Sequence, residues 1–213
     1  MDQLRDGLVL GILLLNFFVL GTSRLSSGIR STALQGAALA ALPIVLGPAW
    51  SPHTLLLAGG TFLIKSLFIP ALLLKAMREA SIRREVEPHV GFVGSLLLGA
   101  LAVAGAFAVT RRLPVATSSA ELLVAGSLAT VTIGLLIIVT RRKAINQVIG
   151  YVLLENGIYL YGLTQSRRVP FLVEMGVLLD VFVGIFVMGI VLFHINREFD
   201  SLDSERLIQL RER

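Results

Sequence analysis

The chain has 213 residues, of which 55% are hydrophobic and 15% are charged, and its mean hydropathy is +0.82. A soluble domain typically has about 45–50% apolar and about 25% charged residues. The composition is therefore typical of a membrane protein, and it excludes a disordered chain. The net charge of +5 does not require a nucleic acid partner, because Lys and Arg also accumulate in cytoplasmic loops. The absence of cysteine excludes disulfides, zinc–thiolate sites and cysteine-ligated iron–sulfur clusters from this chain.

Apolar stretches of roughly 20 residues predict transmembrane helices. The sequence contains seven of them, at about residues 4–22, 33–50, 54–75, 90–110, 120–140, 144–164 and 169–195. Little chain remains for a soluble domain, so we predict an all-α, polytopic membrane protein with about seven transmembrane helices. We do not expect the first stretch to be a cleaved signal peptide, because Asp2 and Asp6 flank a single Arg5 and no clear cleavage site follows.

The distribution of basic residues predicts the orientation in the membrane. When the N-terminus is placed outside, most of the 19 Lys and Arg residues fall in cytoplasmic segments. The positive-inside rule therefore favours an N-out, C-in topology. Residues 197–213 form the expected cytoplasmic tail, which is either a solvated end or a short amphipathic helix on a partner or the bilayer surface.

Three ionisable side chains fall deep inside predicted spans, far from either end: Lys65, Glu155 and Asp180. At 1.5 Å per residue, they lie about 15, 18 and 21 Å from the cytoplasmic ends of their helices. These depths are all near the middle of a hydrocarbon core about 30 Å thick. Because a charge at this depth costs at least a few kcal/mol, its presence is a functional hypothesis. We predict a lateral row of charges in the membrane plane.

The surroundings of Glu155 are polar. Gln147, Tyr151, Glu155 and Tyr159 recur every four residues and so lie on one helix face. This face could position waters and deliver protons to the carboxylate. The alternative is structural: the tyrosine hydroxyls anchor helix packing, and Glu155 binds a neighbouring helix through hydrogen bonds.

Asp180 has glycines at positions 176, 184 and 189 around it. Glycine allows helices to approach closely and permits a local π-bulge. His194 follows 14 residues later on nearly the same helix face. It either continues a proton path to the cytoplasmic surface or is an interfacial histidine.

Lys65 is expected to be buried against protein, because Pro70 interrupts the helix hydrogen bonding that follows it. We weigh two partners for its ammonium. A carboxylate across a subunit boundary would make Lys65 an electrostatic coupling element, whereas a backbone carbonyl at the proline kink would make it a static contact.

The sequence of the last three predicted spans is similar to that of a known protein family. The stretch RRKAINQVIGYVLLENGIYLYGL, followed by EMGVLLDVFVGIFVMGIVLFHINREFDSLD, resembles hydrogenase-4 membrane component E. That family belongs to the membrane arms of formate hydrogenlyase-type complexes, which couple a nickel–iron hydrogenase to antiporter-like subunits. More distantly, these spans are similar to the K subunit of respiratory complex I and the C subunit of multisubunit cation/proton antiporters. Glu155 matches the buried glutamate of the second helix in those subunits. Asp180 matches the glutamate of the third approximately, with a shorter side chain and a shorter spacing.

The resemblance implies a division into a four-helix region at 1–112, a K-subunit-like region at 113–196 and a tail at 197–213. It implies a non-catalytic subunit of the prokaryotic inner membrane, with no cofactor or metal of its own. Its partners would be antiporter-like subunits and a hydrogenase arm with nickel–iron and iron–sulfur subunits. The proton path would use Glu155, Asp180 and Lys65, together with Tyr151, Tyr159, Gln147 and His194. Two rivals remain: a subunit of a cation/proton antiporter without a redox partner, and a structural membrane scaffold.

Overall fold

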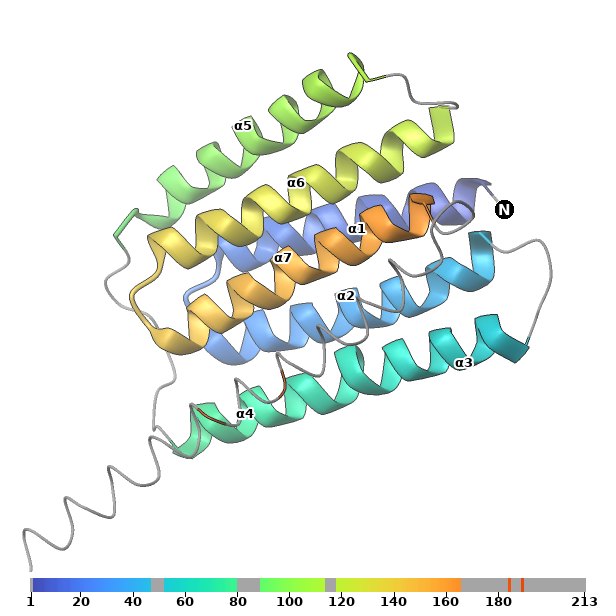
Figure 1. Ribbon diagram of the computed structural model, residues 1–213. Helices are drawn as coiled ribbons and strands as arrows, with labels where there is room; N and C mark the ends of the chain where they lie inside the picture. Colours follow the sequence, from blue (N-terminus) through green and yellow to red (C-terminus); the bar gives the residue numbers. More distant parts are fainter. Residues whose placement is uncertain are drawn as a thin grey trace, which may run out of the picture.

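The computed structural model describes residues 2–46, 52–79, 89–113 and 118–165, together with Gly184 and Gly189. The regular elements in these ranges are helices, as the sequence predicts (Figure 1). In chain order they are α1 (Asp2–Gly21), α2 (Leu25–Leu46), α3 (Pro52–Thr61), the π-helix η1 (Phe62–Phe68), α4 (Ile69–Glu79), α5 (Phe92–Thr110), α6 (Ser118–Thr140) and α7 (Ala144–Gln165).

The elements α3, η1 and α4 follow one another without a break and form one long rod. Successive rods run in opposite directions, so the chain crosses the bundle repeatedly (Figure 1). Five segments in the described part of the chain are long and apolar enough to cross a membrane: Asp2–Gly21, Leu25–Leu46, Thr54–Arg78, Phe92–Thr110 and Ala120–Thr140. The structure is therefore that of a multi-pass membrane protein.

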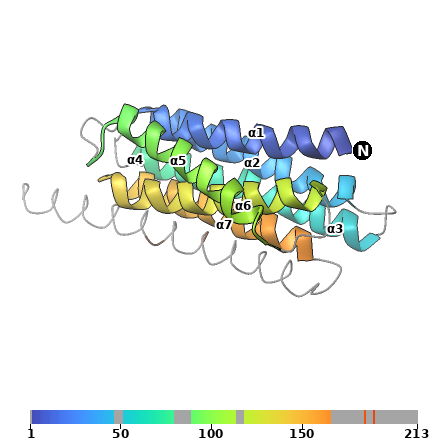
Figure 2. The ribbon, with the colours of Figure 1, turned by 90° about the horizontal axis from the view of Figure 1, so that it is seen from above.

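The centre of the bundle is made by α1, α2, α6 and α7. Helix α1 packs on α2 and α6, and α7 packs on α6 and α2. On one side α5 covers α1 and α6, and on the other side the α3–η1–α4 rod covers α2 (Figures 1 and 2). Helices from the two halves of the chain thus share one core, which contains Ile29, Leu73, Ile137 and Leu153.

The contact between α6 and α7 is close because glycine lies at the crossing. A Cβ added to Gly134 would be 2.5 Å from the backbone nitrogen of Leu154, a distance that real side chains do not reach. Small residues allow membrane helices to approach through their backbones. This contact fixes the position of Leu154 and therefore of the adjacent Glu155.

Large apolar side chains cover the outer surfaces of the rods. Leu14 on α1, Leu56 on α3 and Val93 on α5 are each at least 70% exposed. In water such surfaces would be costly, whereas in a bilayer they contact the hydrocarbon core, which is about 30 Å thick. Their exposure agrees with a bundle that is surrounded by lipid.

Most predicted spans match the helices within a few residues, but α2 begins at Leu25, earlier than the predicted start at residue 33. The intervening polar residues lower the hydropathy without ending the helix. The hydroxyls of Ser31 and Thr32 donate to the carbonyls of Ser27 and Ile29, within their own helix.

The predicted seventh span, 169–195, and the tail lie outside the described residues apart from Gly184 and Gly189. The full count of seven and the N-out orientation therefore stay predictions.

Candidate functional site: a buried ion pair and a polar layer

A buried ion pair lies between the α3–η1–α4 rod and α7. Lys65 Nζ is 3.1 Å from Glu155 Oε1, and each side chain is 1% exposed. The two residues were predicted at a similar depth, and this contact brings them together. The carboxylate comes from the same chain, so it is neither of the two partners weighed from the sequence, a carboxylate of another subunit and a backbone carbonyl at the kink. Burying an ion pair carries a large desolvation cost. Removing one partner strongly destabilises the folded protein, because the other charge stays buried without compensation.

The helix geometry around Lys65 is unusual. Residues Phe62–Phe68 form a π-helix, and the backbone N–H of Ile69 donates to the carbonyl of Ile64, five residues earlier. Pro70 follows directly, and it has no N–H to donate to the preceding turn. The expected interruption therefore takes the form of a π-helix on the N-terminal side of Pro70. Segments of this kind are frequent at functional sites.

A hydroxyl pair lies beside the ion pair. Tyr159 Oη and Thr61 Oγ1 are 3.1 Å apart, and both residues are buried. The ammonium of Lys65 lies 5.6 Å from the centroid of the Tyr159 ring, within the range of a cation–π interaction. Tyr159 thus contacts the Lys65 ammonium with its ring and Thr61 with its hydroxyl.

A chain of side-chain hydrogen bonds crosses the bundle next to Glu155. Asn156 Nδ2 donates to Gln35 Oε1 at 3.2 Å, and Gln35 Nε2 donates to Asn16 Oδ1 at 2.7 Å. Asn16 Nδ2 then donates to Thr130 Oγ1 at 2.9 Å, and this hydroxyl donates to the carbonyl of Gly126. We call Asn156, Gln35, Asn16 and Thr130 the amide chain. Its four side chains join α7, α2, α1 and α6, and each residue is at most 1% exposed.

The polar stripe predicted on α7 is only partly assembled. Glu155 and Tyr159 are buried in the site, whereas Tyr151 is half-buried and packs against the apolar core. Gln147 is exposed and donates to the carbonyl of Arg141 near the start of α7. A four-residue step turns a helix by about 400°, so the stripe rotates by roughly 120° between Gln147 and Tyr159. Asp180 and His194 lie outside the described residues.

Thr61 and the members of the amide chain from α1, α2 and α6 were not among the site residues predicted from the sequence. The signal was present, because Asn16 and Gln35 are isolated amides within apolar spans. Polar side chains in membrane helices form hydrogen bonds between helices. These amides and hydroxyls carry no charge, so they are not among the charged residues that mark the predicted spans.

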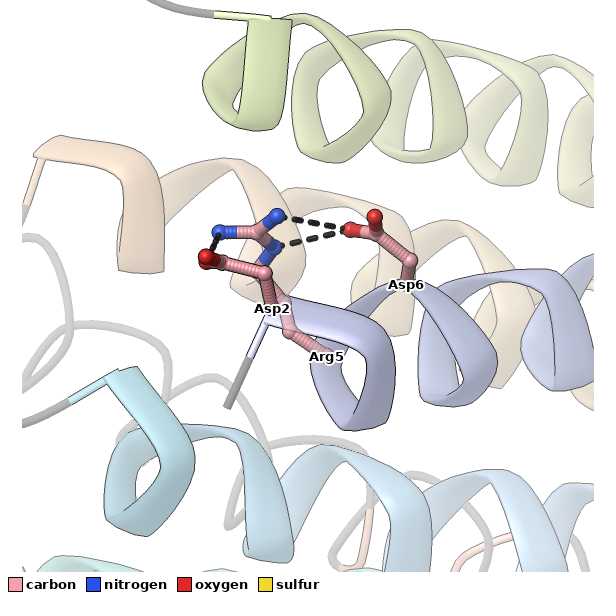
Figure 3. Close-up of polar contacts among 3 residues, drawn as sticks. All are labelled: Asp2, Arg5 and Asp6. Atoms are coloured by element: carbon pink, nitrogen blue, oxygen red, sulfur yellow. Dashed lines mark hydrogen bonds and ion pairs between the residues drawn. The ribbon is translucent and has the colours of Figure 1, made fainter.

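A second charged cluster lies at the end of the bundle that holds the N-terminus of α1. The guanidinium of Arg5 forms ion pairs with Asp2 and Asp6, each at 2.8 Å (Figure 3). The two carboxylates are 86% and 41% exposed, so solvent screens them far more than the Lys65–Glu155 pair. Among the described residues no group of three His, Cys, Asp or Glu side chains is arranged to hold a metal ion.

Comparison with known proteins agrees with this architecture. Residues 122–212 match the family of NADH-ubiquinone/plastoquinone oxidoreductase chain 4L. The chain is 31% identical to hydrogenase-4 component E of Escherichia coli K12, over 94% of either chain. It is also 33% identical to an uncharacterized protein of Mycobacterium tuberculosis, over 95% of this chain and 93% of that protein. No solved structure matches the chain.

The helical bundle and the chain 4L match define a multi-pass membrane subunit of the complex I-like class. The match to hydrogenase-4 component E covers nearly the whole chain and narrows this class to one family. The chain belongs to the hydrogenase-4 component E family, which confirms the resemblance found in its last three predicted spans. Membership of this class implies that the chain works with partner subunits in a membrane complex.

Proposed function

We propose that the chain is a non-catalytic subunit of a complex I-like hydrogenase and that it carries part of a proton path through the membrane interior. In this proposal Glu155 and Asp180 load and release protons, and Lys65 carries or biases charge toward the adjoining subunit. Gln147, Tyr151 and Tyr159 shape the water chain, and His194 continues the path to the cytoplasmic surface. Redox chemistry takes place in partner subunits, including a nickel–iron and iron–sulfur arm.

The observation that carries the proposal is the contact between Lys65 and Glu155. A proton that binds Glu155 neutralises the carboxylate and removes its attraction for the ammonium. Proton occupancy and the geometry of the pair are therefore coupled, since changing one changes the free energy of the other. A redox event that perturbs the electrostatics near Lys65 would in turn change the proton affinity of Glu155.

The proposal extends to location and organisation. The complex lies in the prokaryotic inner membrane, with the N-terminus outside. Residues 1–112 form the region that holds Lys65, residues 113–196 form the K-subunit-like region, and 197–213 form the cytoplasmic tail. The chain 4L match begins at residue 122, near the proposed division.

Copurification tests the partners. The chain is tagged in its source membranes, extracted in mild detergent and isolated with whatever remains bound. The proposal expects nickel and iron–sulfur subunits together with antiporter-like subunits. Recovery with antiporter-like subunits alone would replace the hydrogenase with a cation/proton antiporter.

Two variants of the intact complex in proteoliposomes test the proton path. Glu155→Gln should abolish proton uptake driven by hydrogen turnover while the turnover remains measurable. Because this variant leaves Lys65 without its carboxylate, a Lys65→Gln/Glu155→Gln double variant serves as a neutral control for assembly. If the assembled double variant still translocates protons at the native ratio, Glu155 has a scaffold role and the proposal fails.

A further inference from the structure

We infer that Thr61 is a proton relay directly after Tyr159, and that protons leave the buried pair toward the end of the bundle where α3 begins and α7 ends. This inference rests on the proposed proton path and gives it a direction. The hydroxyls of Thr61 and Tyr159 are 3.1 Å apart, and the two residues are 0% and 2% exposed.

The direction follows from the positions of the four residues along two antiparallel rods. Thr61 precedes Lys65 by four residues, and Tyr159 follows Glu155 by four residues. Because the α3–η1–α4 rod and α7 run in opposite directions, Thr61 and Tyr159 are both displaced toward the same end, by about 6 Å along their helices from Lys65 and Glu155. The orientation predicted from the sequence makes this the external end.

The same rod face continues toward that end. Thr54 precedes Thr61 by seven residues, or almost two helical turns, and therefore lies on nearly the same face. It is half-buried in the first turn of α3. A further hydroxyl thus lies between the buried pair and the end of the bundle.

The chemistry of the neighbouring groups selects this direction. A hydroxyl both donates and accepts hydrogen bonds, so it can accept one proton while releasing its own, and it is left with no net charge. The amide chain lies on the other side of the site, toward α1 and α6. Its amide nitrogens donate without accepting protons, so Asn156, Gln35 and Asn16 hold the helices together and close the lateral route.

Substitutions at Thr61 test the inference in the intact complex in proteoliposomes. Thr61→Val keeps the shape and removes the hydroxyl, and it should lower the number of protons moved per hydrogen turned over at least tenfold. Thr61→Ser keeps the hydroxyl and should retain the native ratio. Thr110→Val on α5, which removes a buried hydroxyl that donates to the carbonyl of Ala106 in its own helix, is the matched control and should also retain the native ratio.

Tyr159→Phe provides an independent test if Thr61→Val does not assemble. It keeps the aromatic ring over Lys65 and removes only the hydroxyl, so it should cause the same loss as Thr61→Val. Native ratios in Tyr159→Phe or in assembled Thr61→Val would overturn the inference. If Glu155→Gln abolishes translocation in the same assay, the relay at Thr61 fails while the proposed function stands. If Glu155→Gln also retains translocation, both fail.

Discussion

Gly36 on α2 lies directly against the backbone of Lys65 in η1. A Cβ added at Gly36 would be 2.7 Å from the carbonyl carbon of Lys65, closer than packed side chains approach. The two rods therefore touch at the residue that carries the buried ammonium. The spacing between α2 and η1 determines how far Lys65 reaches toward Glu155.

Gly36→Ala should push η1 away from α2 and weaken the buried pair. Overpacking of this kind costs about 1–3 kcal/mol, so we expect a lower unfolding temperature in detergent and less assembled complex. The control is Gly60→Ala on α3, in the rod that contains η1, because a Cβ there meets no described atom within 4 Å. The unfolding temperature of the control should equal or slightly exceed that of the native protein. Equal losses of unfolding temperature in both variants would contradict the role of the α2–η1 contact.

Gln35→Leu should break the amide chain at its centre. Leucine accepts no hydrogen bond from Asn156 Nδ2 and donates none to Asn16 Oδ1, and each buried group left unpaired costs about 1–3 kcal/mol. Unfolding of the purified protein in a denaturing detergent measures the loss. Gln147→Leu, which changes an exposed glutamine at the start of α7, should have little effect. A Gln35→Leu protein as stable as the native one would show that the amide chain does not hold the helices.

Arg141→Lys should loosen the turn between α6 and α7. The Arg141 guanidinium donates to the carbonyl of Leu20, and it stacks 4.6 Å from the centroid of the Phe92 ring. Lysine keeps the charge but lacks the planar group that makes both contacts, so we expect a loss of about 1–3 kcal/mol. Proteolysis at this end and the unfolding temperature report the change. The exposed neighbour provides the control, since Arg142→Lys should change stability by less than about 0.5 kcal/mol.

Asp6→Asn should have a small effect in spite of the short ion pair with Arg5. The Asp6 carboxylate is 41% exposed, and exposed pairs contribute about 0.2–1 kcal/mol. Salt should reduce even this difference, because it screens charges that are in contact with water. Unfolding temperatures at low and high salt measure the effect. A loss as large as that of Arg141→Lys would mean that the Arg5 cluster is part of the buried structure.

Helix positions were predictable from the sequence because long apolar stretches have few alternatives in a bilayer. Helix boundaries were less predictable where polar side chains form hydrogen bonds to carbonyls of their own helix, as Ser31 and Thr32 do in α2. The similar depth of Lys65 and Glu155 followed from counting residues along each span. Their direct contact did not, because it depends on which rods are neighbours.

The same limit applies to the rest of the site. The sequence indicated a polar face on α7, but helical rotation separates Gln147 from Tyr159, and only the structure shows which residues of that face meet a neighbour. Thr61 belongs to the site because its rod packs beside α7. No pattern within 54–75 distinguishes that threonine from one facing lipid.

The sequence separation of 90 positions from Lys65 to Glu155 has a consequence for biogenesis. At a synthesis rate of about 5–20 residues per second, the lysine leaves the ribosome roughly 5–18 s before its carboxylate. During that interval the third span enters the bilayer before Glu155 has been made, and a lysine at the centre of a span costs about 2.5–3.5 kcal/mol on insertion scales. The apolar residues around Lys65 offset this cost. When α7 packs against the earlier helices, Glu155 reaches Lys65 and the buried pair forms.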